Sequence, residues 1–173
     1  QYILVYMAKA HSEINYEAEG TVQIQKYNRK PESREMLYRI ASPYTEVGQN
    51  LGEWYGELNL PEGEIRDRAL WIAGFVKRKL KKREETEKEG LLTADQAAGR
   101  GYGSTRDFAQ IMLALCRMDG MTARYVTGIL PGKTQLHAWV EVQEENGIFY
   151  GVDPEFGIPV TESYIVFCQG RDA

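Results

Sequence analysis

The chain has 173 residues, of which 43% are hydrophobic and 27% are charged, and this composition suits one globular domain with an apolar core. The formal net charge of −4 argues against a nucleic acid or an anionic membrane as the main partner. A basic run at residues 77–83 is followed at once by an acidic run at 84–89. Because these charges nearly cancel locally, they predict the solvated end of a helix.

The sequence predicts no metal site and no membrane segment. Two cysteines, Cys116 and Cys168, and two histidines, His11 and His137, are too few at useful spacing for a Cys/His zinc site. No apolar run is long enough to span a bilayer, and no secretory signal is visible. We therefore expect no metal and no cofactor, and slightly favour a cytoplasmic protein. The chain does not begin with Met, so a signal lost from a processed or trimmed chain remains an open alternative.

The first part of the chain is predicted to be rich in β-structure. Residues 2–6 form an apolar β-type run, and residues 21–25 alternate apolar with polar side chains. Residues 35–40 fit either a strand or a helix, and we favour a strand. We expect an N-terminal β-rich segment over residues 1–41 and a core domain over 42–173, joined in one compact unit.

From about Gly48 the spacing of apolar residues lengthens to that of helices. Residues 51–58 fit a short amphipathic helix that Pro61 stops. Residues 62–88 fit a longer helix, with acidic residues at its start and basic ones near its end, as the helix dipole favours.

A short helical turn at residues 92–97 and a glycine-rich stretch at 99–103 lead into a third helix over residues 104–118. Ser104 or Thr105 would cap its first turn, and Gly120 ends it. The pattern then becomes that of strands, over residues 123–130, 137–143, 147–152 and 164–167, with a hairpin turn at 145–147. Helices followed by an antiparallel sheet predict an α+β domain.

Three residues of this layout form a candidate catalytic triad. Thr105 begins a helix, His137 begins a strand and Asp153 follows the next strand, which is the order of a nucleophile, its base and the residue that orients the base. Taken singly, the histidine fits a half-buried strand residue and the aspartate fits a turn. The combination with the glycine-led helix favours a site.

The residues around this triad resemble the transglutaminase-like superfamily. Residues 103–109, 114–117 and 123–128 resemble its central block, while 137–142 and 151–154 resemble its histidine and aspartate blocks. The resemblance covers residues 42–173, in the order and spacing of the family. The terminal residues 170–172 resemble a tail seen in bacterial members, which indicates a chain that stops slightly short of its natural end.

This resemblance implies a papain-like α+β core in which a cysteine at a helix N-terminus attacks an amide or ester carbonyl. The family's histidine position falls on His137, its acid position on Asp153 and its nucleophile position on Thr105. A thiol at a helix N-terminus beside an imidazolium is readily stored as a thiolate, whereas an alkyl hydroxyl is not. The methyl group of threonine also restricts its χ1 rotation and crowds the path of attack.

Other residues are weaker candidates for the nucleophile. Cys116 follows Phe108 and Met112 at steps of four, which predicts a buried packing role, and we also expect Cys168 to pack. Ser104 is more plausible as a helix cap, although a helix that started one residue earlier would point it into the site. We expect Trp139, Tyr102 and Ser104 to contact the substrate, and Arg106 and Asp107 to be structural.

These observations leave three functional alternatives. The favoured one is a weakly active or inactive domain, with a Thr/His/Asp version of the Cys/His/Asp triad, that binds a peptide or amide-containing ligand in its cleft. The second is an active amidase, peptidase or protein-crosslinking enzyme. The third is an interaction module in which the cleft has no role.

Overall fold

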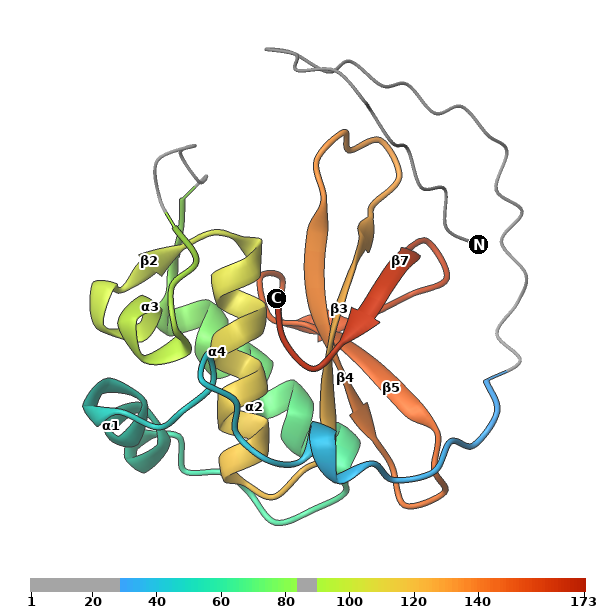
Figure 1. The fold of residues 1–173 in the computed structure, drawn as a ribbon, viewed down its shortest axis with the longest axis horizontal. Coiled ribbons are helices and arrows are strands. Elements are labelled where there is room, and N and C mark those ends of the chain that lie inside the picture. The colour runs from blue at the N-terminus through green and yellow to red at the C-terminus, as the bar shows by residue number, and fades with distance from the viewer. Residues whose placement is uncertain (1–28, 84–89) are drawn as a thin grey trace, which may run out of the picture.

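A computed structural model describes residues 29–83 and 90–173. It confirms the predicted α+β class, with α-helices over residues 49–118 and an antiparallel sheet over residues 123–170 (Figure 1). The predicted strands at residues 2–6 and 21–25 lie outside the described residues. Among the residues that are described, no helix is long and apolar enough to cross a membrane.

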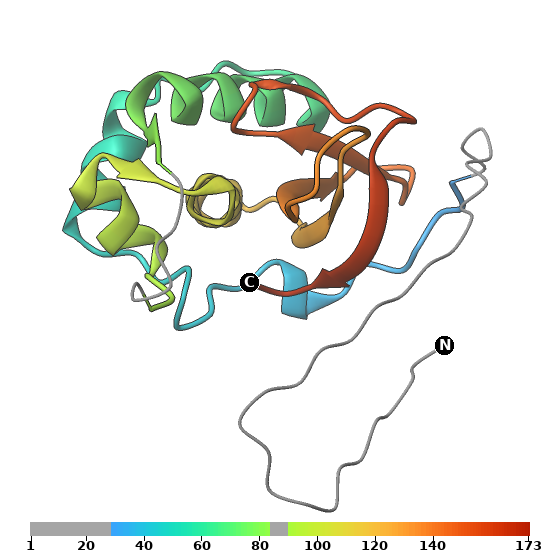
Figure 2. The same ribbon diagram turned by 90° about the horizontal axis from the view of Figure 1, so that it is seen from above.

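The described residues form four α-helices, of which α4 is central. They are α1 (Gln49–Glu57), α2 (Ile65–Lys79), α3 (Ala94–Arg100) and α4 (Thr105–Met118). Seen from above, α4 lies between α3 and the sheet, while α2 runs across both α4 and the sheet (Figure 2). Eleven residues of α4, from Asp107 to Arg117, are buried, as expected of a helix that is covered on all sides.

The main sheet has five strands in the order β6-β5-β4-β3-β7, and all neighbours are antiparallel. Its strands are β3 (Ala123–Ile129), β4 (His137–Gln143), β5 (Phe149–Asp153), β6 (Ile158–Pro159) and β7 (Ile165–Gly170). The hairpin turn between β4 and β5 contains Gly147 at φ 83°, a left-handed conformation that glycine adopts without strain.

The two faces of this sheet have different neighbours. Ala138, Val140 and Val142 of β4 belong to the large apolar core that includes α4. The alternate residue Trp139 belongs to a small second cluster with Val126 and Tyr164. Successive side chains of a strand point to opposite faces, so His137 and Trp139 lie on the face that bears this second cluster.

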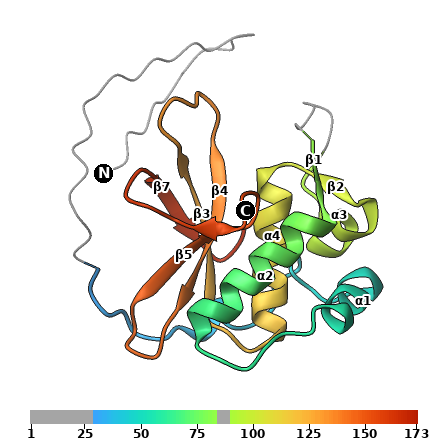
Figure 3. The same ribbon diagram turned by 180° about the vertical axis from the view of Figure 1, so that it is seen from behind.

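Two predicted elements differ in the structure. Residues 35–40 contain a short 3-10 helix, Met36–Tyr38, with none of its residues buried, so the favoured strand prediction is wrong: no neighbouring strand pairs with it among the described residues. The helix predicted over 62–88 ends at Lys79, because the next residues, Lys81–Lys82, form strand β1 and pair in parallel with β2 (Tyr102–Gly103) (Figure 3).

The last residues of the chain return to α4. Buried Arg117 donates hydrogen bonds to Asp172 Oδ1 at 2.9 Å, to the Arg171 carbonyl at 2.6 Å and to Thr45 Oγ1 at 2.8 Å. Ala173 lies near the middle of α4, where its backbone N–H donates to Gln110 Oε1 at 3.4 Å. The segment after β7 is therefore held against the same helix whose N-terminus carries Thr105.

Candidate active site

The N-terminus of α4 is fixed by a capping box. Ser104 precedes the helix, and both its backbone N–H and its hydroxyl donate to Asp107 Oδ2, at 2.8 and 3.0 Å. Ser104 and Asp107 are buried. Their reciprocal contacts stabilise the first turn and confirm that Asp107 has a structural role and Ser104 is the cap. Ser104 also lines the pocket described below.

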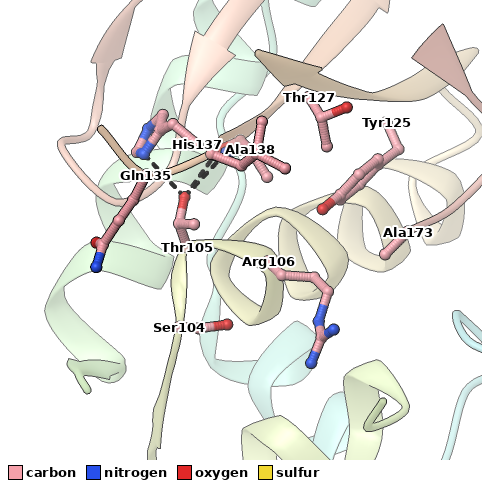
Figure 4. A pocket seen from close by; sticks show the side chains of 10 residues that line it. Ser104, Thr105, Arg106, Tyr125, Thr127, Gln135, His137, Ala138 and Ala173 are labelled. Atoms are coloured by element: carbon pink, nitrogen blue, oxygen red, sulfur yellow. Dashed lines mark hydrogen bonds between the residues drawn. The ribbon is translucent and has the colours of Figure 1, made fainter. Parts of the chain in front are cut away.

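Thr105, the first residue of α4, faces the start of β4 (Figure 4). Its Oγ1 lies 3.0 Å from His137 Nδ1. The same oxygen lies 3.2 Å from the Ala138 carbonyl oxygen and accepts a hydrogen bond from the Ala138 N–H at 3.1 Å. The ladder between β4 and β5 begins only at Val140, so the threonine hydroxyl supplies the partner that Ala138 does not obtain from β5.

His137 is held on its other side by Asp153. The distance from Nε2 to Asp153 Oδ2 is 2.6 Å, and the two side chains are buried. Because an ionised carboxylate only accepts hydrogen bonds, this contact assigns the proton to Nε2 and leaves Nδ1 of the neutral ring as an acceptor toward Thr105. The structure thus brings the three residues predicted from the sequence into one continuous hydrogen-bonded line.

The carboxylate of Asp153 is fully engaged. Oδ1 accepts the backbone N–H groups of Glu155 at 2.9 Å and Phe156 at 3.3 Å, while Oδ2 accepts from His137 and from the Tyr164 hydroxyl at 2.9 Å. Burial, followed by the negative charge of Asp153, raises the pKa of Tyr164 above its usual value. Tyr164 therefore stays protonated and remains a donor.

A pocket of about 420 Å³ opens beside Thr105 and His137. Apart from these two, its lining includes both polar and apolar side chains: Ser104, Arg106, Tyr125, Thr127, Gln135, Leu136, Ala138 and Ala173. The Arg106 side chain extends away from the Thr105 hydroxyl (Figure 4). This lining combines hydrogen-bonding groups with apolar surface, which is the usual composition of a small-ligand site.

Two of the predicted substrate contacts lie outside this pocket. Trp139 is fully buried, because Val126 and Tyr164 pack against it in the second cluster. The prediction that it contacts substrate is wrong for this pocket. Tyr102 lies on β2, where the Arg83 guanidinium is 4.8 Å from the centre of its ring, and it does not line the pocket either.

The two cysteines differ from each other. Cys116 is fully buried in α4, and burial raises the pKa of its thiol well above the usual range, which confirms its packing role and removes it as a nucleophile. Cys168 is exposed on β7, so the packing role predicted for it is wrong. The reason is that β7 is the last strand of the sheet. None of the described residues covers this part of it, and Val166 and Phe167 are exposed as well.

Three residues of the site were missed by sequence reasoning. The Tyr164 hydroxyl contacts Asp153. The ring of Phe156 stacks on His137 with a centroid separation of 5.5 Å and an interplanar angle of 15°. Glu155 Oε2 lies 4.0 Å from His137 Nδ1. Glu155 and Phe156 follow Asp153 directly, so their position could have been predicted from a turn after Asp153-Pro154. No local pattern in the sequence marks Tyr164.

Solved structures share this fold. The structure resembles a protein from Cytophaga hutchinsonii described as a candidate cysteine protease, with a TM-score of 0.68 and 22% identity over 79% of this chain and 47% of that one. It also resembles the periplasmic domain of TgpA from Pseudomonas aeruginosa, with a TM-score of 0.51 and 17% identity over 66% of this chain and 46% of that one. At these identities the likeness concerns the fold alone.

Curated relatives match a shorter part of the sequence. Uncharacterized proteins from Mycobacterium bovis and Mycobacterium tuberculosis are 36% identical over 85 residues, which cover 40% of this chain and 27% of theirs. The match thus spans about a quarter of the length of these relatives. The sequence model of the transglutaminase-like superfamily matches residues 56–154, which is more than half of the chain and includes Thr105, His137 and Asp153. The chain therefore belongs to the transglutaminase-like superfamily.

Proposed function

We propose that this domain binds a peptide or another amide-containing ligand in the pocket beside Thr105, and that acyl transfer by Thr105 is slow or absent. The observation that carries the proposal is the engagement of the Thr105 hydroxyl by the backbone of Ala138. Its oxygen lies within 3.2 Å of both the N–H and the carbonyl of that residue, as well as 3.0 Å from His137 Nδ1.

These contacts compete with nucleophilic attack. The hydroxyl has one proton, which it donates either to His137 Nδ1 or to the Ala138 carbonyl, and only the first arrangement prepares proton transfer to the base. The Ala138 N–H occupies one of the two lone pairs of the same oxygen, and this makes the oxygen a weaker nucleophile. A thiolate, which is the nucleophile that the family resemblance implies at this position, is stored in advance and needs no such transfer.

The pocket favours an amide-containing ligand because both its polar and its apolar groups are suited to a peptide. Thr127 and Gln135 present side-chain hydrogen-bonding groups, and Gln135 offers both a donor and an acceptor. Leu136, which precedes His137, is 63% exposed and provides an apolar contact at the rim.

A second candidate function is active acyl transfer, as in an amidase, peptidase or protein-crosslinking enzyme. The 2.6 Å contact between His137 and Asp153 and the 3.0 Å contact between Thr105 and His137 favour it, since both lie within the range that a general base and its orienting residue require.

A glutaminyl-glycine dipeptide with blocked termini is the probe that distinguishes the two functions. We expect it to shift the backbone amide resonances of Thr127, Leu136 and Ala138, while ammonia release stays at the level of the His137→Ala variant. Ammonia release above that level, as an amidase or a crosslinking enzyme would cause, or release of the blocked glycine, as a peptidase would cause, would establish the second candidate. An absence of amide shifts up to the solubility limit of the dipeptide would contradict the binding proposal.

A further inference from the structure

A buried tyrosine shares the carboxylate that holds the candidate base. The Tyr164 hydroxyl donates to Asp153 Oδ2 at 2.9 Å, and the same oxygen accepts from His137 Nε2 at 2.6 Å. The other oxygen of Asp153 is taken by two backbone N–H groups. Since a carboxylate offers about four acceptor sites, Tyr164 fills the last one, and no site is left for water or another donor.

The ring of Tyr164 is fixed by packing. It packs edge-on against Trp139, with ring centroids 5.3 Å apart and an interplanar angle of 82°. Against His137 the centroid separation is 6.2 Å and the interplanar angle is 64°. Only 7% of Tyr164 is exposed. Because Trp139 and His137 both lie on β4, the hydroxyl is placed by the same strand that carries the candidate base.

We propose that Tyr164 is a positioning residue of this site, which acts through Asp153: its hydroxyl shares Oδ2 with His137 and so sets how strongly Asp153 draws the Nε2 proton. This inference rests on the Thr105–His137–Asp153 arrangement of the proposed function, but it does not depend on whether Thr105 is catalytic. Two donors on one oxygen divide its negative charge. Removal of the hydroxyl therefore makes Oδ2 a stronger acceptor for His137, in addition to freeing the carboxylate to move.

The test is NMR spectroscopy of the His137 ring in a His11→Gln background, where it is the single histidine of the chain. Correlations from the ring C–H groups give the nitrogen shifts even where the N–H proton is not observed. In Tyr164→Phe we expect the Nε2 nitrogen and, where visible, its proton to move downfield. The matched control is Tyr150→Phe on β5, whose ring contacts Arg66 at 4.6 Å, and it should leave the His137 shifts unchanged.

A double-mutant cycle separates this role from a general packing effect. With Asp153→Ala as the background, Tyr164→Phe should produce no further downfield shift at His137, because the shared acceptor is gone. A shift of the same size in both backgrounds would overturn the proposal, and so would unchanged Nε2 resonances in the folded single variant.

A second measurement covers the case in which Tyr164→Phe does not fold. Uniform incorporation of 3-fluorotyrosine keeps the ring and makes the phenol a stronger donor, so the Nε2 resonance should move upfield, opposite to the shift expected for the phenylalanine variant. An Nε2 resonance that stays in place or moves downfield would overturn the proposal. Neither readout involves turnover or ligand binding, so its result is independent of the dipeptide experiment.

Discussion

The two halves of the candidate site differ in what their hydrogen bonds accomplish. On one side, Asp153 holds His137 with a saturated, buried carboxylate that Tyr164 helps to fix. On the other side, Thr105 is divided between His137 and the backbone of Ala138. The first half has the arrangement of a base and the residue that orients it, whereas the hydroxyl of the second half also links α4 to β4. The comparison teaches that, within one hydrogen-bonded line, the hydroxyl at the candidate nucleophile position also bonds to the backbone of the neighbouring strand.

The largest expected effect concerns the acid–base half. Asp153→Ala leaves His137, Tyr164 and two backbone N–H groups without their acceptor, and we expect a loss of about 3–5 kcal/mol in the free energy of unfolding, measured by urea denaturation. Asp67→Ala is the matched control, because Asp67 is an exposed aspartate in the first turn of α2, and it should cost less than about 1 kcal/mol. A similar cost for both variants would show that the carboxylate network adds little.

The next largest effect concerns the hydrogen bonds between the Thr105 hydroxyl and the backbone of Ala138. Thr105→Val keeps the shape of the side chain but leaves the Ala138 N–H and carbonyl without their partner, so we expect a loss of about 1–3 kcal/mol. Thr105→Ser retains the hydroxyl and should lose less than about 1 kcal/mol. Both values come from urea denaturation under the same conditions. Equal stabilities of the valine and serine variants would remove the structural function of the hydroxyl.

The smallest effect is a pH dependence that arises at Tyr164. Its pKa is raised above the ordinary value of 10.0, so the folded state keeps the proton where the unfolded chain begins to lose it. The contribution to stability is complete below pH 10 and is lost as the pH rises toward the folded-state pKa. The free energy of unfolding should therefore fall more steeply above pH 10 in the wild type than in Tyr164→Phe, by less than about 1.4 kcal/mol per pH unit. If the free energy of unfolding fell equally with pH in the wild type and in Tyr164→Phe, this would contradict the burial of the Tyr164 hydroxyl.

The elements around the site were predictable because their signals are local. The helix predicted over residues 104–118 is observed as α4 (Thr105–Met118), and the strand predicted over 137–143 is observed as β4. Thr105, His137 and Asp153 were identified because each lies at the end of such an element and because the residues around them resemble the three blocks of the family. The division into segments 1–41 and 42–173 remains a prediction.

The errors have nonlocal causes. The charge pattern after Lys79 fits a longer helix, but Lys81 and Lys82 are drawn into parallel pairing with Tyr102 and Gly103, some 20 residues away. Trp139 was expected in the cleft because it adjoins His137 in sequence, yet it is buried beneath Tyr164 on the opposite face from Ala138. Pairing partners and the cover of each sheet face depend on the complete fold, and a single stretch of sequence does not specify them.

We propose that His137 and Asp153 are arranged to activate a nucleophile and that the residue at position 105 limits the chemistry. The most direct test introduces a thiol by Thr105→Cys in a Cys116→Ala, Cys168→Ala background and measures the rate of alkylation by iodoacetamide near neutral pH. We expect alkylation at position 105 to be at least about tenfold faster than in the same protein with His137→Ala, because the imidazole promotes formation of the thiolate. Equal, slow rates with and without His137 would contradict the claim and show that both halves of the site have lost their catalytic organisation.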